Sequence, residues 1–277
     1  MSPTSRLAAG TIAIFALAGM AAHAETDYLW PRFSVDAGAL SLSTQDEIRL
    51  NGELEILGRP VDFQTDFGLP DSKTALGLRL DWAFADRHSV DLQYYSLDRD
   101  ASRSILREVE IGNIEFPIGA SASASFKTTT IESSYTYWFL RNESFGLGGS
   151  FGLVYLGLDA GVSARGQFGP GGSTVSRSIS ESTDVPVPMI GMAVKGSPFR
   201  RLVLFAYGRI LPSVSVGDYD GSAGSFGAGA NYFLFGPLAV GASFNGTYYR
   251  AGIDTSNWEG DIDLSQNAWN LYLRAAW

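Results

Sequence analysis

Cysteine is absent from this chain, and histidine occurs only twice, at His23 and His88. The lack of cysteine excludes disulfides, thiolate nucleophiles and cysteine-ligated metals. Charged residues make up only 18% of the chain, and acidic residues outnumber basic ones, giving a net charge of −9. Nucleic acid is therefore not expected as a partner, because contacts to phosphates require a basic surface.

Long apolar runs are also missing beyond residue 24, so no membrane-spanning helix is predicted there. The one long apolar run, 7–20, follows Arg6 and precedes Ala22-His23-Ala24, which is a small-x-small cleavage pattern. We predict a secretory signal peptide over 1–24 and a mature domain over 25–277. The alternative is a retained anchor, but the run is shorter than the roughly 20 residues that cross a bilayer. Cleavage removes Arg6 and no acidic residue, so the net charge changes from −9 to −10.

The final residues of the chain alternate strictly between apolar and polar side chains. Trp269, Leu271, Leu273, Ala275 and Trp277 occupy alternate positions, separated by Asn270, Tyr272 and Arg274. A period of two places the first set on one face of a β-strand and the second set on the other. Large apolar side chains on one face need lipid or a protein core to cover them.

The same alternation recurs along the whole mature chain. In 74–85, Leu76, Leu78, Leu80 and Trp82 share one face, and the opposite face is small or charged. This pattern is typical of a strand with one face toward lipid and the other toward a barrel lumen. Ten such segments are expected: 33–39, 74–85, 90–94, 131–139, 145–155, 190–194, 202–210, 226–234, 238–248 and 266–277.

Short and long connections alternate between these segments. Short turns occur near Asp86, Asn142, Ser197 and Gly236, and longer connections cover 44–73, 100–121, 159–185, 212–223 and 251–265. This alternation is expected when short turns lie on the periplasmic side and long loops lie outside. The predicted fold is all-β: a transmembrane antiparallel up-and-down β-barrel of about ten strands. Eight strands are the alternative if the first or seventh segment is not a strand.

These features resemble the small monomeric outer-membrane β-barrels of Gram-negative bacteria over essentially the whole mature chain. In that group the final strand usually ends in Phe or Trp and is recognised by the barrel-assembly machinery; Trp269, Leu271, Leu273 and Trp277 match that strand. The resemblance implies a monomer in the cell outer membrane, surrounded by lipid and lipopolysaccharide, with the assembly machinery as a partner during insertion. A soluble sandwich or propeller also has many short strands and is the alternative.

Catalysis has few candidate residues. His88 is the only histidine of the mature chain, and it lies in a predicted periplasmic turn, far from the outer rim where the outer-membrane proteases and lipid-modifying enzymes carry their sites. Acidic residues crowd the segments 46–71 and 254–263, but solvated carboxylates lack the distinct environments that acid–base pairs need. We predict no enzyme activity, no catalytic residue, no metal and no cofactor; a lipid-modifying enzyme is a distant alternative.

Inward-facing charges are the strongest candidates for a functional site. Opposite charges inside a barrel must pair, because an unpaired buried charge costs several kcal/mol. The predicted lumen charge network consists of Arg79, Asp81, Asp91, Glu132, Arg209 and Arg274. Two interpretations remain open at this point, a narrow polar path beside these side chains and a lumen that they fill.

The expected function follows from the same alternatives. A passive narrow channel or a barrel that holds a small solute or hydrophobic ligand is the first hypothesis, and a structural or adhesive surface protein with a filled lumen is the second. Arginines of the second outer connection, Arg99, Arg103 and Arg107, would lie near anionic lipid headgroups or beside a groove. Ordinary extension of the strands above the bilayer is the favoured interpretation of this segment.

Overall fold

A computed structural model describes residues 27–48, 54–55, 68–104, 109–111, 114–116, 119–167, 174–216, 219–255 and 258–277. The predicted signal peptide, 1–24, lies outside the described residues. Every regular element in the described part of the chain is a β-strand. No helix among the described residues is long and apolar enough to cross a membrane.

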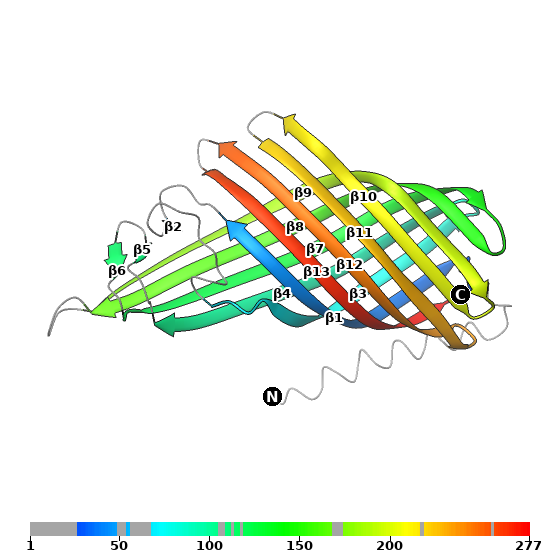
Figure 1. Cartoon of the computed structure of the whole chain (residues 1–277), viewed down its shortest axis with the longest axis horizontal. Coiled ribbons are helices and arrows are strands. Elements are labelled where there is room, and N and C mark those ends of the chain that lie inside the picture. The colour runs from blue at the N-terminus through cyan, green and yellow to red at the C-terminus, as the bar shows by residue number, and fades with distance from the viewer. Residues whose placement is uncertain are drawn as a thin grey trace.

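Ten antiparallel strands close into a barrel, as predicted (Figure 1). The barrel closes where β1 pairs with β13, and backbone hydrogen bonds of 2.8 and 2.9 Å join Phe33 and Trp277 in both directions. A separate sheet of three short strands comprises β2 (Leu54–Glu55), β5 (Val109–Ile111) and β6 (Ile114–Phe116). The barrel strands are β1 (Phe33–Ile48), β3 (Ser72–Ala85), β4 (His88–Ser104), β7 (Ser121–Arg141), β8 (Phe145–Gln167), β9 (Thr174–Phe199), β10 (Leu202–Val216), β11 (Tyr219–Phe235), β12 (Leu238–Thr255) and β13 (Trp258–Ala276).

Tight turns join the strands at one end of the barrel, at three of the four predicted positions. The turn predicted near Ser197 lies instead at Arg200 and Arg201, because β9 continues to Phe199. In the β7–β8 turn, Asn142 accepts hydrogen bonds through Oδ1 from the backbone nitrogens of Ser144 and Phe145. In the β11–β12 turn, Gly236 has a φ of 50°, a left-handed conformation that favours glycine. These local features fix the register of each hairpin.

The strands extend further at the other end than the sequence pattern predicts. Of the predicted loop 159–185, only 168–173 falls between strands, because β8 and β9 stay paired from Phe145↔Gly196 to Gln167↔Thr174. The outer part of β9 places Ser176, Ser178 and Ser180 on the exposed outer face. This alternation has polar residues outside, so a search for lipid-facing apolar residues does not detect it.

The outer surface changes character along the barrel. Nearer the tight turns it carries a band of exposed apolar residues, including Leu76, Leu271 and Ile190, which suits a bilayer. Beyond Tyr155 on β8 and Pro186 on β9, the outward positions become small and polar. The outer surface thus has one part suited to lipid and one part suited to water.

The interior changes in the opposite sense. Beside the apolar band the lumen contains charged side chains such as Arg209 and Glu132. Toward the outer end two apolar clusters fill it. One contains Leu40, Leu42, Ala75, Tyr95, Leu97 and Ala268, and the other includes Phe126, Val154, Leu156, Leu158, Met189 and Leu264. The outer end therefore packs as a water-soluble β-structure does, with an apolar core.

The ring of strand pairing is continuous only in the part nearer the turns. The β9–β10 ladder ends at Ile190↔Ile210, and the β3–β4 ladder ends at Gly77↔Tyr95. Beyond these points β4, β7, β8 and β9 continue as one four-stranded sheet, which we call the outer extension. Figure 1 shows this sheet diverging from strands β10 to β13.

Candidate functional site

A chain of ion pairs crosses the lumen beside the apolar band. It contains three arginines and four acidic residues from β1, β3, β4, β7, β10 and β13. Alternation explains the arrangement, because each residue lies one position from an outward apolar residue of its own strand. In order of contact the members are Asp36, Arg274, Asp81, Arg79, Asp91, Arg209 and Glu132.

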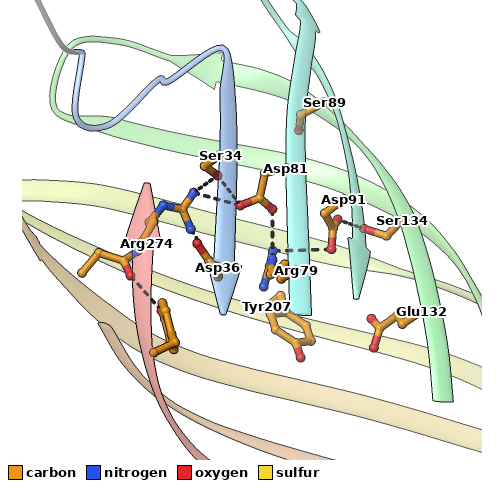
Figure 2. Close-up of polar contacts among 12 residues, drawn as sticks. Ser34, Asp36, Arg79, Asp81, Ser89, Asp91, Glu132, Ser134, Tyr207 and Arg274 are labelled. Atoms are coloured by element: carbon orange, nitrogen blue, oxygen red, sulfur yellow. Dashed lines mark hydrogen bonds and ion pairs between the residues drawn. The ribbon is translucent and has the colours of Figure 1, made fainter. Parts of the chain in front are cut away.

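Arg274 joins the last strand to β1 and β3 at one end of this chain. Its guanidinium lies 3.0 Å from an oxygen of Asp36 and 2.8 Å from an oxygen of Asp81. It also donates a 2.5 Å hydrogen bond to Ser34, whose hydroxyl in turn donates to Asp81 at 2.8 Å (Figure 2). Three strands at the closure of the barrel are thereby held together by one side chain.

Arg79 occupies the middle of the chain. Its Nε lies 3.0 Å from Asp81 Oδ1, and its Nη2 lies 3.4 Å from Asp91 Oδ1 (Figure 2). Asp91 also accepts a hydrogen bond from the hydroxyl of Ser134. Asp81 on β3 and Asp91 on β4 are directly opposite each other in the strand pairing. The side chain of Arg79 therefore links these two lumen-facing carboxylates.

Arg209 is the most buried of the three arginines in this chain of ion pairs, with 4% of its surface exposed. It forms an ion pair and hydrogen bond with Glu132, and its Nη2 lies 3.8 Å from Asp91 and 2.7 Å from Ser134 Oγ. Its guanidinium also lies 4.6 Å from the ring centre of Tyr207. Because β10 and β7 are not neighbours in the barrel, the ion pair between Arg209 and Glu132 crosses the lumen.

The structure brings together all six residues of the predicted network, and it adds Asp36. The sequence contained a signal for this residue, because Asp36 lies between the outward residues Val35 and Ala37 and must face the lumen. The proximity of Asp36 to Arg274 depends on which strands meet at the barrel closure. Such a long-range contact is not encoded in the local pattern.

The segment before β1 occupies the end of the barrel nearer the turns. Leu29 is buried with Val203, Phe233, Ala239 and Ala276, and Tyr28 packs on this cluster. We call residues 28–30 the mouth segment. This position was not predicted, because three residues carry too little periodicity to indicate a partner.

Trp30 fastens the mouth segment to the barrel wall. Its Nε1 donates a 2.8 Å hydrogen bond to the carbonyl of Asn142, and its ring lies 5.3 Å from that of Trp138 in an edge-on arrangement. Lys195 Nζ lies 3.9 Å from the Trp30 ring centre and the Arg141 guanidinium lies 4.4 Å from it. Two cation–π contacts and a hydrogen bond therefore hold this side chain in place.

Small cavities lie between these groups in the described part of the lumen. A cavity of about 50 Å³ lies beside Asp36, Arg79, Gln93 and Tyr272. A second cavity, of about 10 Å³, touches Glu132 and Tyr207. Each suits one or a few water molecules. Neither cavity offers the volume of an organic ligand, for which pockets of roughly 300–1,000 Å³ are usual.

Two predicted features of the outer region need correction or lie outside the described residues. Arg99 was expected near lipid headgroups, but it faces inward, is fully buried and lies over the ring of Phe126 at 5.1 Å. Its neighbours Asp98 and Asp100 take the outward positions of the strand. The whole of Arg107 lies outside the described part, as do the side chains of Arg103 and of most acidic residues of 46–71 and 254–263.

His88 belongs to a group of aromatic residues near the tight turns. Its ring lies near Phe84, Tyr135 and Tyr137, and its Nδ1 is 2.7 Å from the Tyr135 hydroxyl. Such amphipathic side chains are typical of the membrane–water boundary. Within the described residues, no group of three or more His, Asp or Glu is placed to hold a metal ion.

The predicted assembly strand is β13. Trp269, Leu271 and Leu273 are among the most exposed apolar residues of the described surface, whereas Trp277 packs against Phe33 with ring centres 5.2 Å apart. Ala275, predicted on the same outward face, is 9% exposed and lies between Val35 and Leu238 on the paired strands. Recognition of this strand by the assembly machinery stays a prediction.

No protein-family model matches this chain, and no curated protein sequence matches it. Solved structures do match. The outer membrane protease OmpT of Escherichia coli is similar over 88% of this chain and 96% of its own, with 12% identity and a TM-score of 0.54. The translocator domain of the autotransporter NalP of Neisseria meningitidis aligns over 98% and 96%, with 13% identity and a TM-score of 0.37.

A third similar structure is the outer membrane protein OprG of Pseudomonas aeruginosa, aligned over 90% of this chain and 97% of its own, with 13% identity and a TM-score of 0.33. At such identities the likeness shows the fold alone, and the likeness to OmpT carries that conclusion. The fold is that of a Gram-negative outer-membrane β-barrel.

Proposed function

We propose that this protein is a closed outer-membrane barrel that acts at the cell surface, as a structural or adhesive protein, rather than as a channel for polar solutes. The single observation that carries the proposal is the ion-pair chain across the lumen. Its arginines and carboxylates are bound to one another from β1 round to β10, so a hydrated solute would have to displace paired, buried charges.

The mouth segment supports the same proposal. Leu29 is buried at the end of the lumen opposite the outer extension, and Trp30 is held by Lys195, Arg141 and Asn142. A solute would meet this segment before or after the charges. Two successive layers of packed side chains favour a filled lumen over a narrow path.

The outer extension supplies the surface for a role outside the cell. Its exposed face carries hydroxyls in register across neighbouring strands: Ser102 and Ser123 are hydrogen-bonded at 2.7 Å, and Ser123, Ser163 and Ser178 are paired in sequence across β7, β8 and β9. A flat, hydroxyl-rich sheet of this kind offers many hydrogen-bonding groups to a partner or to lipopolysaccharide sugars. Export through a cleavable signal peptide over 1–24 and insertion by the assembly machinery belong to this proposal.

Catalysis is not part of the proposal. His88 lies in the aromatic group near the turns, and each carboxylate of the ion-pair chain contacts an arginine. A lipid-modifying enzyme therefore stays a distant alternative.

Single-channel recording tests the closed lumen. The mature chain is refolded into planar bilayers beside an Arg79→Ala/Arg209→Ala variant and an Arg250→Ala control, whose arginine lies in an exposed ion pair outside the lumen. We expect no discrete conductance from the unaltered protein or the control, and small steps from the double variant. Steady steps from the unaltered protein would overturn the proposal.

A second measurement separates the structural role from the adhesive one. Cells that lack the protein are compared with cells that produce it, both for leakage of a periplasmic enzyme and for attachment to a surface. A structural protein reduces leakage, whereas an adhesive protein increases attachment. No change in either property would contradict a role at the surface.

A further inference from the structure

The barrel wall contains a break in strand pairing between β9 and β10. Their uninterrupted ladder runs from Gly196↔Leu204 to Ile190↔Ile210 and then ends. The same register, continued by two residues, would place Pro188 opposite Pro212. Proline has no N–H group, so neither residue can donate a hydrogen bond across this position. The sequence therefore terminates the ladder from both strands at once.

The pairing of β9 with β8 shows which edge the missing donors face. That ladder passes through Tyr155↔Pro186 and Leu153↔Pro188 without a shift of register. A proline within a continuous ladder must have its nitrogen on the opposite edge, so both nitrogens face β10. On β10, the register with β11 shifts between Leu211 and Val214, at Pro212 itself. We call the facing edges 186–189 and 211–213 the β9–β10 seam.

The seam lies within the apolar band and not above it. Leu153, next to Pro188, is an exposed apolar residue, and so are Ile190 and Ile210 at the last pair of the ladder. Behind the seam the interior is apolar, because Val187, Met189 and Leu211 belong to or pack on the larger outer cluster. The seam thus has lipid on one side and an apolar core on the other, unlike the charged lumen nearer the turns.

A groove on the lipid-facing surface leads to this seam. Its volume is about 470 Å³, and its lining includes Tyr135, Phe151, Met192, Ile190 and Ile210. Its lining also includes Gly149, and an added Cβ at Gly149, or at Gly208 on the neighbouring β10, would meet no atom within 4 Å. Ile190 and Ile210 line the groove and also form the last strand pair before the seam. The two features are therefore continuous.

We propose that the groove and the β9–β10 seam bind one acyl chain of a membrane lipid. The lining residues Phe151, Ile190 and Met192 are exposed on the apolar band, so the groove faces the bilayer and its occupant is expected to come from the membrane. The groove is a shallow, open surface feature of about 470 Å³, which suits a flexible chain lying along the barrel wall. A protein partner would need a far larger complementary surface, of about 800 Å² on each side. An acyl chain fits both the apolar lining and the elongated continuity of groove and seam.

Native mass spectrometry of the refolded mature chain tests the site. The protein is transferred from mixed micelles of detergent and palmitoyl-oleoyl phosphatidylethanolamine, and the retained lipid is counted as the detergent is stripped. A Gly149→Leu/Gly208→Leu variant fills the groove at two open positions. The matched control, Ala228→Leu/Ala242→Leu, adds the same side chains at exposed positions on β11 and β12. A heat-dependent gel shift checks that each variant is folded.

We expect one retained lipid per barrel for the unaltered protein and the control, and at least tenfold less for the groove-filled variant. If the double variant does not fold, Gly149→Leu alone replaces it. A Pro188→Thr/Pro212→Thr variant restores a backbone N–H group at both positions and allows β9 and β10 to pair across the seam. This variant is also expected to retain less lipid. Equal retention by the filled variant and the control would overturn the site. Retention of oleic acid in place of the phospholipid, in a parallel sample, would overturn the membrane lipid as its occupant.

Discussion

Removal of the buried guanidinium of Arg209 is expected to destabilise the barrel far more than removal of an exposed one. An Arg209→Met variant keeps most of the side-chain volume but leaves Glu132 without its ion-pair partner. Breaking a buried ion pair costs about 3–5 kcal/mol, because an uncompensated charge stays in the interior. Asp91 keeps Arg79 at 3.4 Å, so we expect a value near the lower end of that range, about 3 kcal/mol.

The matched control is Arg250→Met. Arg250 pairs with Asp263 at 3.0 Å, but the two side chains are 69% and 48% exposed. Exposed ion pairs contribute about 0–1 kcal/mol, so this variant should unfold close to the unaltered protein. A double variant, Arg209→Met/Glu132→Met, removes both charges and is expected to recover most of the lost stability, since apolar replacement of a buried pair is often neutral.

Urea unfolding in phosphatidylcholine vesicles, followed by tryptophan fluorescence, measures these differences. The comparison is valid if the slope of the unfolding free energy against urea concentration stays constant among the variants. The reasoning is refuted if Arg209→Met and Arg250→Met lose the same stability. It is also refuted if the double variant is no more stable than Arg209→Met.

Three further outcomes are expected. Gly191→Val should prevent folding or lower the free energy of unfolding by more than about 3 kcal/mol, because a Cβ at Gly191 would lie 2.0 Å from a backbone oxygen. Gly149→Ala should be tolerated, and a heat-dependent gel shift distinguishes the folded variant from the unfolded one. Trp30→Ala removes the contacts that hold the mouth segment, so trypsin should cut faster after the exposed Arg32. Mass spectrometry of the fragments measures this rate, and an unchanged rate would mean that other contacts hold the segment in place. Trp277→Ala should slow insertion by purified assembly machinery with less effect on spontaneous refolding, and equal slowing of both would contradict recognition of the terminal strand.

The membrane-spanning part of the fold was predictable because its two faces differ so strongly. Alternation in 74–85 and 266–277 identified strands, and the turn residues near Asn142 and Gly236 identified hairpins. The outer extension was assigned to loops because its polarity is reversed, with serines outside and apolar residues inside. A pattern search that allows either face to be apolar would have found it in 156–165, where Leu156, Leu158 and Val162 are buried and alternate with small or polar residues.

The sequence predicts which charged residues face the lumen, but not which of them form ion pairs with one another. Alternation places Arg79, Arg209 and Arg274 in the lumen, yet which carboxylate each one meets depends on strand order, shear and side-chain length. The mouth segment had no periodic signal at all. The break at Pro188 and Pro212 likewise required the register of two strands, since each proline alone is compatible with an ordinary strand end.

Closure of the barrel between β1 and β13 also determines how the protein can fold. Asp36 and Arg274, which meet at this closure, are separated by 238 positions in the sequence, so their contact needs nearly the whole mature chain. Folding rates fall as contacts become more distant in sequence. Before the barrel closes, the two unpaired strand edges make the chain prone to aggregation. Pairing of β1 with β13 is therefore expected late in folding, and the unpaired edge of β1 stays open to aggregation until most of the chain is in place.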